Sequence, residues 1–188
     1  MKIPFFKYQG TGNDFVMIDN RTNLFDKTNI SVIQHLCNRK FGIGSDGLIL
    51  IENLPDFDFN MVFFNPDGSQ SFCGNGSRCA VAFAKYLGII ESQAFFNSTD
   101  GEHEAWISSN GDVSLKMHDV KVIEKGDGYY FINTGSPHYI KEETNLKELD
   151  VVADGREIRY NERFKEEGTN VNFVKYNQES LEIRTYER

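Results

Sequence analysis

A strongly apolar helical segment in the first half of the chain restricts the fold more than any other feature. Residues 76–87 have the spacing of a helix, Gly88 follows as a helix-ending glycine, and residues 80–84 (AVAFA) are apolar around the whole circumference. A helix that is apolar all round lies inside a core rather than on a surface. The sequence therefore predicts a central buried helix that other elements cover.

Short apolar segments on both sides of this helix predict β-strands. Asp100-Gly101 and Asn110-Gly111 are two-residue hairpin signals that join three of the segments. The expected class is α+β, with mostly antiparallel strands wrapped around the central helix. Strands are predicted at residues 5–19 (two strands around a turn), 48–51, 58–64, 94–98, 104–108, 113–117, 129–133, 139–140, 171–176 and 181–187, and short helices near 30–37 and 151–160.

The chain is predicted to form two parts, residues 1–119 with the central helix and residues 120–188 after a linker at 121–128. The second part has no matching buried helix, and about 70 residues are marginal for an independent domain. Residues 181–188 end within a strand pattern, without a turn or a polar tail. We expect from these features that the chain is cut short within a second lobe.

The charge and the cysteine usage restrict the partners and the compartment. Lys and Arg number 20 against 28 Asp and Glu, and the resulting net charge of -8 argues against nucleic acid and anionic membrane as partners. Three cysteines without a CxxC pair predict neither a disulfide framework nor a zinc site, and they fit a reducing compartment. With no signal peptide or membrane-spanning apolar segment at hand, a cytoplasmic location is expected.

Cys73 stands in an unusual position, between a polar turn and the predicted central helix. A helix N-terminus favours negative charge and therefore the thiolate form of cysteine. The Gly-Asn-Gly that follows it lets a ligand approach the bare backbone, and a carboxylate fits the unpaired N–H groups there. These features predict a reactive thiolate beside an anion pocket. Cys37 and Cys79 are expected to be small buried side chains on helices, as most unpaired cysteines are.

Five segments in order along the chain resemble the diaminopimelate epimerases. They are GTGNDFVMID (10–19), FGIGSDGLI (41–49), FNPDGSQSFCGNGSRC (64–79), GTNVNFV (168–174) and TYER (185–188). The related proline racemases share the fold and a cysteine pair, but the extended CGNGSRC segment is more similar to the diaminopimelate enzymes. The resemblance implies two similar lobes, each a set of strands around a central helix, with the second lobe incomplete here.

The resemblance also implies an activity. Diaminopimelate epimerases are isomerases that interconvert LL- and meso-2,6-diaminopimelate, on the route to lysine and peptidoglycan. They use two cysteines on opposite faces of the substrate α-carbon, need no cofactor and no metal, and commonly form homodimers. By this resemblance the partner is a small-molecule substrate, with no nucleic acid or membrane involved.

Residue roles follow from the same resemblance. Cys73 corresponds to one cysteine of the catalytic pair, His138 to a histidine that tunes the pair, and Glu187 to an acidic residue near the second cysteine. The residues implied to bind substrate are Asn13, Asn65, Gly74, Asn75, Asn170, Glu187 and Arg188.

The sequence departs from the family pattern in two ways. Gly47 and Ser136 stand where several relatives carry Gln and Asn that touch the substrate. The second catalytic cysteine, which in the family follows shortly after the TYER segment, is not among these 188 residues. The chain by itself is therefore expected to be inactive.

Three alternatives remain open from the sequence. The first is a racemase of another amino acid on the same fold, for which Gly47 and Ser136 leave room. The second is a ligand-binding module without catalysis. The third is a thiol hydrolase that pairs Cys73 with a histidine, although no triad spacing is recognisable.

Overall fold

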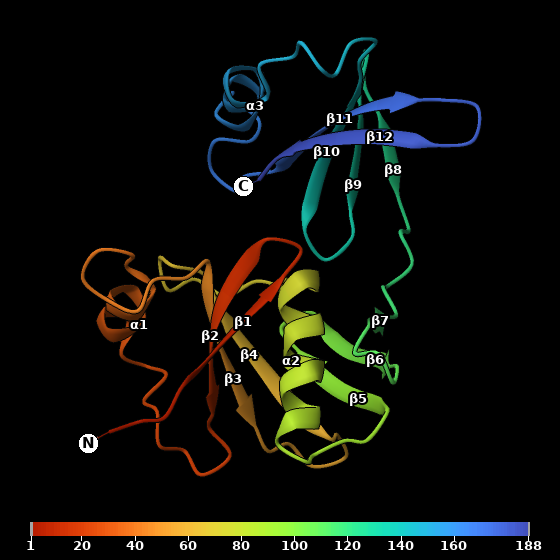
Figure 1. Ribbon diagram of the computed structural model, residues 1–188. Helices are drawn as coiled ribbons and strands as arrows, with labels where there is room; N and C mark the ends of the chain where they lie inside the picture. Colours follow the sequence, from red (N-terminus) through yellow and green to blue (C-terminus); the bar gives the residue numbers. More distant parts are fainter. Residues whose placement is uncertain (1, 188) are drawn as a thin grey trace. The chain divides into compact units, whose positions relative to one another are not determined.

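The chain folds into two compact units, Met1–Met117 and His118–Arg188, in a computed structural model that describes residues 2–187 (Figure 1). Each unit contains one β-sheet with helices packed on it. In the described residues no helix is both long and apolar enough to cross a membrane. The α+β class predicted from the sequence is confirmed.

The first unit contains a seven-stranded sheet in the order β1-β2-β3-β4-β5-β6-β7. The pairs β2/β3 and β4/β5 are parallel and the remaining pairs are antiparallel, so the prediction of mostly antiparallel strands is confirmed. The strands are β1 (Phe6–Gly10), β2 (Asn13–Asp19), β3 (Gly47–Glu52), β4 (Phe59–Phe64), β5 (Gln93–Ser98), β6 (Gly101–Ile107) and β7 (Val113–Leu115).

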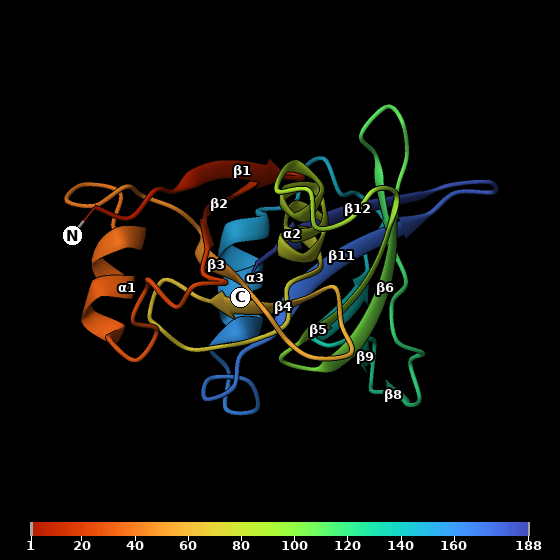
Figure 2. The same cartoon turned by 90° about the horizontal axis from the view of Figure 1, so that it is seen from below.

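The central strands of this sheet are covered on both faces, as the apolar sequence of residues 58–64 predicted. Ile49 and Ile51 of β3 face the helix α2 (Gly74–Tyr86), whereas Leu48 and Leu50 pack with Ile33 of the helix α1 (Ile30–Cys37). Figure 1 and Figure 2 both show β3 between the two helices. Successive side chains of a strand point to opposite faces, so one strand serves both cores.

The helix α2 is buried on the side that faces the sheet and not all round its circumference. Ala80, Val81, Phe83 and Ala84 are fully buried, but Ala82 is only partly buried and Tyr86 is 65% exposed. The reason is the geometry of the sheet, whose two edge strands, β1 and β7, flank an open hollow of about 400 Å³ over the helix. The prediction that α2 is buried on every side is therefore wrong, because the side that faces the hollow is partly exposed.

The second unit contains a five-stranded sheet in the order β12-β11-β10-β9-β8, in which only β10 and β11 are parallel among the described pairs. Its elements are β8 (Ile123–Lys125), β9 (Tyr130–Asn133), β10 (Pro137–Glu142), α3 (Val151–Arg159), β11 (Asn170–Tyr176) and β12 (Leu181–Tyr186). The strand β8 lies inside residues 121–128, which were predicted to be a linker. Hydrogen bonding to β9 stabilises this short strand, and the local sequence carries no sign of that pairing.

The helix α3 covers one face of the second sheet. Its Val151 and Ile158 pack with Leu146, Val171 and Phe173 in a small apolar core. Gly155 allows the close approach, since a Cβ atom there would lie 2.4 Å from the Cβ of Tyr186 on β12. His138 and Asn170 lie side by side on two strands of the same sheet.

Phe83 tests how strongly the unit depends on α2. The ring is fully buried and contacts Phe6 and Tyr8 of β1, with ring centroids 5.0 and 5.6 Å away. We expect Phe83→Ala to lower the free energy of unfolding by about 3–5 kcal/mol, because it removes buried area and leaves a cavity. Urea unfolding followed by circular dichroism measures this change. The control is Phe41→Ala, whose ring is 77% exposed; an equal loss in both variants would contradict the packing described.

Candidate active site

Cys73 caps the N-terminus of α2. Its backbone is extended, its Sγ accepts a hydrogen bond from the Gly76 N–H at 3.3 Å, and its carbonyl accepts one from the Ser77 N–H at 2.8 Å. The helix begins at Gly74, two residues earlier than the sequence indicated, because the cysteine itself acts as the cap. The half-buried thiol therefore lies where the helix dipole favours a negative charge.

The first turn of α2 offers backbone donors beside the thiol. In the described part of the chain, no hydrogen bond occupies the N–H groups of Gly74 and Asn75, which is usual for the first turn of a helix. The backbone at Gly74 is also open, since a Cβ atom there would meet only the Arg78 side chain, at 4.0 Å. This arrangement fits a carboxylate at the helix N-terminus.

The core of the first unit holds this helix start in place. A Cβ atom on Gly76 would lie 3.1 Å from the Ile49 side chain, so the helix begins in close contact with β3. Phe72, the residue before the thiol, is 6% exposed and stacks on the ring of His103 with centroids 4.6 Å apart. The position of Cys73 is thus fixed by packing on both sides of it.

Asn13 and Asn75, which lie 62 positions apart, meet directly. The Nδ2 of Asn75 donates to the Oδ1 of Asn13 at 2.7 Å, and the Nδ2 of Asn13 donates to Asp46 at 3.3 Å. Arg78 donates to the Oδ1 of Asn75 and, at 3.0 Å, to the hydroxyl of Thr11. The turn between β1 and β2 can come this close because Gly10 has no side chain: a Cβ atom there would lie 3.1 Å from the Asn75 carbonyl.

Asn65 occupies the turn that leads from β4 toward Cys73. Its Nδ2 donates to the Ser69 carbonyl at 3.2 Å and to the hydroxyls of Ser69 and Ser71 at 3.1 Å. These contacts order the polar loop between the strand and the thiol. The described contacts do not join Asn65 to Asn13 or to Asn75.

Gly47 lies in a tight contact within the sheet. A Cβ atom at this position would lie 2.3 Å from the ring of Phe63 and 2.8 Å from the carbonyl of Phe64. A side chain at residue 47 therefore requires that Phe63 move.

The other two cysteines are core residues, as the sequence predicted. Cys37 is 3% exposed and Cys79 is 4% exposed, and no disulfide joins any of the three cysteines. Burial raises the pKa of the Cys79 thiol to about 11, and its neighbour Cys73 adds to this rise. Burial also raises the pKa of Cys37. Both side chains are therefore neutral thiols near pH 7.

In the second unit, His138 and Asn170 are register partners on β10 and β11. His138 is half-buried, and its Nδ1 lies 3.2 Å from the Nδ2 of Asn172. The Oδ1 of Asn172 accepts a hydrogen bond from the Thr185 hydroxyl at 3.0 Å. Burial lowers the pKa of His138, and the hydrogen bond with Asn172 opposes this shift without cancelling it.

The remaining predicted residues of the second unit lie at its sheet ends. Asn170 donates to the hydroxyl of Ser136 at 3.1 Å and to the Pro137 carbonyl at 3.3 Å. Glu187 is exposed and follows the end of β12 directly. Arg188 lies outside the described residues.

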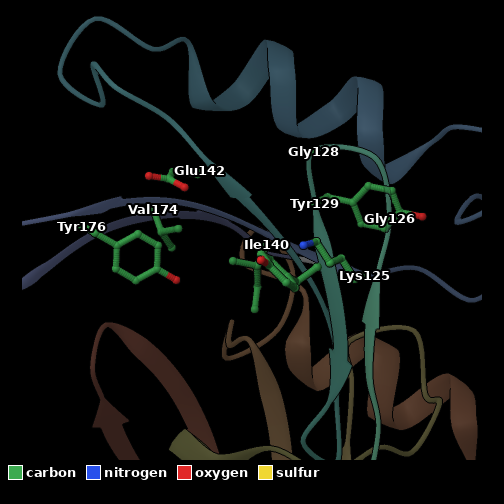
Figure 3. Close-up of a pocket in the computed structure, with 9 residues that line it drawn as sticks. Lys125, Gly126, Gly128, Tyr129, Ile140, Glu142, Val174 and Tyr176 are labelled. Atoms are coloured by element: carbon green, nitrogen blue, oxygen red, sulfur yellow. The ribbon is translucent and has the colours of Figure 1, made fainter.

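A hollow of about 260 Å³ lies on the second sheet, over later residues of the strands β10 and β11 that carry His138 and Asn172 (Figure 3). It is lined by one cation, one anion and several tyrosines: Lys125, Gly126, Gly128, Tyr129, Tyr130, Ile140, Glu142, Val174 and Tyr176. None of the residues predicted to bind substrate lines it, so the hollow does not belong to the candidate site.

Three polar residues of these networks were missed from the sequence: Asp46, Arg78 and Asn172. Asp46 and Arg78 stand inside the GSDG and CGNGSRC segments, but Asn13, at the start of β2, and Thr11, in the β1–β2 turn, bond to them from far away in the sequence. For Asn172 a signal was present. It follows Asn170 by two residues, and this spacing places both on one face of a strand.

Known structures of proteins with different names share this fold. A Bacillus anthracis phenazine biosynthesis protein of the PhzF family matches with a TM-score of 0.70 and 14% identity, over 100% of this chain and 73% of that chain. A probable proline racemase from Agrobacterium radiobacter matches with a TM-score of 0.65 and 13% identity, over 99% of this chain and 71% of that chain. At these identities the likeness establishes the fold alone.

The sequence comparisons establish the family. The family model for diaminopimelate epimerase matches residues 5–123. The diaminopimelate epimerase of Flavobacterium psychrophilum is 51% identical over 185 residues, which are 97% of this chain and 72% of the relative. That of Chlorobaculum tepidum is 40% identical over 188 residues, which are 95% of this chain and 73% of the relative.

These matches show that the chain is of the isomerase class, as an epimerase. The chain belongs to the diaminopimelate epimerase family. The resemblance seen in the sequence motifs is thereby confirmed.

Asp14 gives a pH test of the start of β2, where Asn13 also lies. Burial opposes ionisation of this carboxyl, but hydrogen bonds from Arg39 and Lys7 outweigh it and lower its pKa from 3.8 to about 2. The stabilisation is present above pH 3.8 and is lost as the pH falls toward 2. We expect Asp14→Asn to cost about 1 kcal/mol at neutral pH, because solvent screens part of the interaction.

Urea unfolding between pH 7 and pH 2 measures this contribution. The difference in unfolding free energy between the wild-type chain and Asp14→Asn should shrink toward the acid end. The control is Asp56→Asn, an exposed aspartate outside the cluster. A difference that stays constant with pH would contradict the assignment.

His138 gives a second pH test. Its folded pKa lies below the ordinary value of 6.5, so its contribution to stability is present above that pH and is lost as the pH falls through the folded value. We expect the imidazole resonance, assigned with His138→Gln, to titrate below 6.5 in the folded protein. The same chain in denaturant should titrate at the ordinary value. A folded midpoint at or above the unfolded one would disprove the shift.

Proposed function

We propose that Cys73 is one catalytic acid–base of an epimerase that interconverts LL- and meso-2,6-diaminopimelate. The observation that carries the proposal is the position of the thiol, which caps α2 beside the backbone N–H groups of Gly74 and Asn75, on which residues 2–187 place no hydrogen bond. A base and a carboxylate-binding site thus lie next to each other, as proton removal from an α-amino acid requires. Membership of the family supports the choice of substrate.

The reaction removes the proton from one face of the α-carbon and delivers a proton to the opposite face. The Cys73 thiolate takes the α-proton and becomes a thiol, and the electron pair of the broken C–H bond stays on the substrate as a carbanion. A second thiol on the opposite face gives up its proton to the α-carbon and becomes a thiolate. Oriented N–H donors stabilise the charge that develops on the carboxylate. For the reverse reaction the two thiols exchange roles.

The remaining residue roles of the proposal follow the family resemblance. In the first unit, Gly74 and Asn75 bind the α-carboxylate, and Asn13 and Asn65 hydrogen-bond the substrate. In the second unit, Asn170, Glu187 and Arg188 complete the binding set, while His138 and Glu187 act on the cysteine pair. The neutral state that burial favours in His138 suits a proton acceptor near pH 7.

The 188 residues by themselves are proposed to be unable to epimerise. The mechanism needs a second accessible thiol, and Cys37 and Cys79 are both buried in the core of the first unit.

The rest of the proposal follows the family. The enzyme works without a cofactor or a metal, in the cytoplasm, on the route to lysine and peptidoglycan. The complete protein forms a homodimer.

A racemase of another amino acid is the second candidate. The observation that favours it is the contact between Gly47 and Phe63, which leaves no room for a substrate-binding side chain at residue 47. Ser136, which accepts a hydrogen bond from Asn170, also favours the racemase candidate. A ligand-binding module without catalysis is the remaining alternative.

The test uses the complete product of the gene with LL-diaminopimelate in D₂O. We expect formation of the meso isomer with deuterium at the α-carbon, and a loss of at least about 100-fold in kcat in Cys73→Ala, since a positioned acid–base contributes that much or more. Proline and glutamate, assayed side by side, decide between the two enzymatic candidates.

The control variant is Cys37→Ala, which removes a thiol that lies away from the proposed site. Its activity should stay within a few-fold of the wild type. The 188-residue chain should give no conversion. Robust conversion by that chain, or full activity of Cys73→Ala, would overturn the two-thiol proposal.

A further inference from the structure

A continuous chain of hydrogen bonds runs across the N-terminus of α2. It begins at the carboxylate of Asp46, which accepts from the amide of Asn13 at 3.3 Å. It continues from Asn13 to the amide of Asn75 at 2.7 Å, and from there to the guanidinium of Arg78. The two ends of this chain carry opposite charges, and two asparagine amides lie between them.

The charged ends determine which way each amide points. A carboxylate only accepts hydrogen bonds and a guanidinium only donates them. Asn13 must therefore turn its NH₂ group toward Asp46, and Asn75 must turn its oxygen toward Arg78. If either amide rotated by half a turn, a donor would face a donor or an acceptor would face an acceptor. The orientation of the two amides thus follows from chemistry, and it is the orientation seen in the structure.

Both ends of the chain are themselves held. The other carboxylate oxygen of Asp46 accepts from Arg39 at 2.7 Å, and the backbone N–H of Asp14 donates to the first oxygen at 3.1 Å. Arg78 also donates to the hydroxyl of Thr11 at 3.0 Å, in the turn between β1 and β2. Neither charged group is therefore a loose surface side chain.

The fixed orientation decides what the two amides still offer to a ligand. Each NH₂ group donates one N–H to the hydrogen-bond series, and within residues 2–187 its second N–H is left to donate to a ligand. The backbone N–H groups of Gly74 and Asn75 lie on the same helix turn. These side-chain and backbone N–H groups together form a cluster of hydrogen-bond donors, and the cation Arg78 bonds to one member of it, Asn75. This is the character that a carboxylate requires.

We propose that Arg78 and Asp46 are positioning residues, which impose a donor-presenting orientation on Asn13 and Asn75 for the substrate carboxylate. This inference rests on the proposed function, because it takes the two asparagines as substrate-binding residues. Arg78 acts through Asn75 and does not itself touch the substrate.

The decisive experiment is a double-mutant cycle on the complete gene product. We expect Arg78→Met to raise the KM for diaminopimelate by about 10-fold to 100-fold, the usual effect of losing a hydrogen bond to a charged group, with a much smaller change in kcat. Arg78→Lys should restore part of the loss, since an ammonium can still donate to Asn75. If Arg78 acts through Asn75, the double variant Arg78→Met/Asn75→Ala binds no worse than Asn75→Ala alone.

The matched control is Arg21→Met, which removes an arginine from an ion pair with Asp19 outside the chain of bonds. Its KM should stay at the wild-type value. Fully additive effects of Arg78→Met and Asn75→Ala would overturn the proposal, because they would mean that Arg78 acts on the substrate directly or on the fold as a whole.

A second measurement separates this proposal from the proposed function. The side-chain ¹⁵N–¹H resonances of Asn13 and Asn75 in the 188-residue chain report the orientation of the amides without any substrate. Arg78→Met should shift both pairs of resonances, and Arg21→Met should shift neither. Unchanged resonances would disprove the positioning role even in an active epimerase, whereas shifted resonances in a protein inactive on diaminopimelate would leave the role intact and reject only the substrate.

Discussion

The packing of α2 against the seven-stranded sheet is the interaction on which the rest of the first unit depends. Phe83 and its buried neighbours form the core, and the close contact of Gly76 with Ile49 fixes where the helix starts. Because Cys73 is the cap of that same helix, the thiol is placed by the core and not by a mobile loop. The stability of the first unit and the proposed chemistry at Cys73 therefore both depend on α2.

The polar groups around the thiol are organised by charge. Asp14, Arg39 and Asp46 form an ion-pair cluster, and Asp46 of this cluster bonds to the amide of Asn13. Arg78 bonds to the amide of Asn75, at the other end of the amide pair. A neutral amide has no preferred direction of its own, but an amide between a carboxylate and a guanidinium does. In the proposed site, Asp46 and Arg78 thus set the direction of the amide donors without having to touch the substrate.

In the second unit, neutral hydrogen bonds rather than ion pairs hold the polar side chain of Asn172. Asn172 is held by the Thr185 hydroxyl on one side and lies against the His138 ring on the other. All three residues come from neighbouring strands of one sheet, so their spacing is set by the strand register. Burial by the same sheet keeps the imidazole neutral to a lower pH than in water.

The sequence by itself determined the elements and the family. Periodicity and turn chemistry located the strands and α2, since apolar spacing and Asp-Gly or Asn-Gly pairs act over a few residues. The motifs around Cys73 indicated the epimerase family, and the comparisons confirmed it. The core positions of Cys37 and Cys79 were also predictable, because each lies on the apolar side of a helix.

Only the tertiary structure decided how distant segments meet. The parallel pairing of β2 with β3, the strand β8 within the predicted linker, and the open side of α2 all depend on sheet order, which no local pattern encodes. The same holds for the bond chain from Asp46 through Asn13 and Asn75 to Arg78. Its members come from three separate segments of the sequence, and the bond between Asn13 and Asn75 forms where Gly10 lets the β1–β2 turn approach the helix.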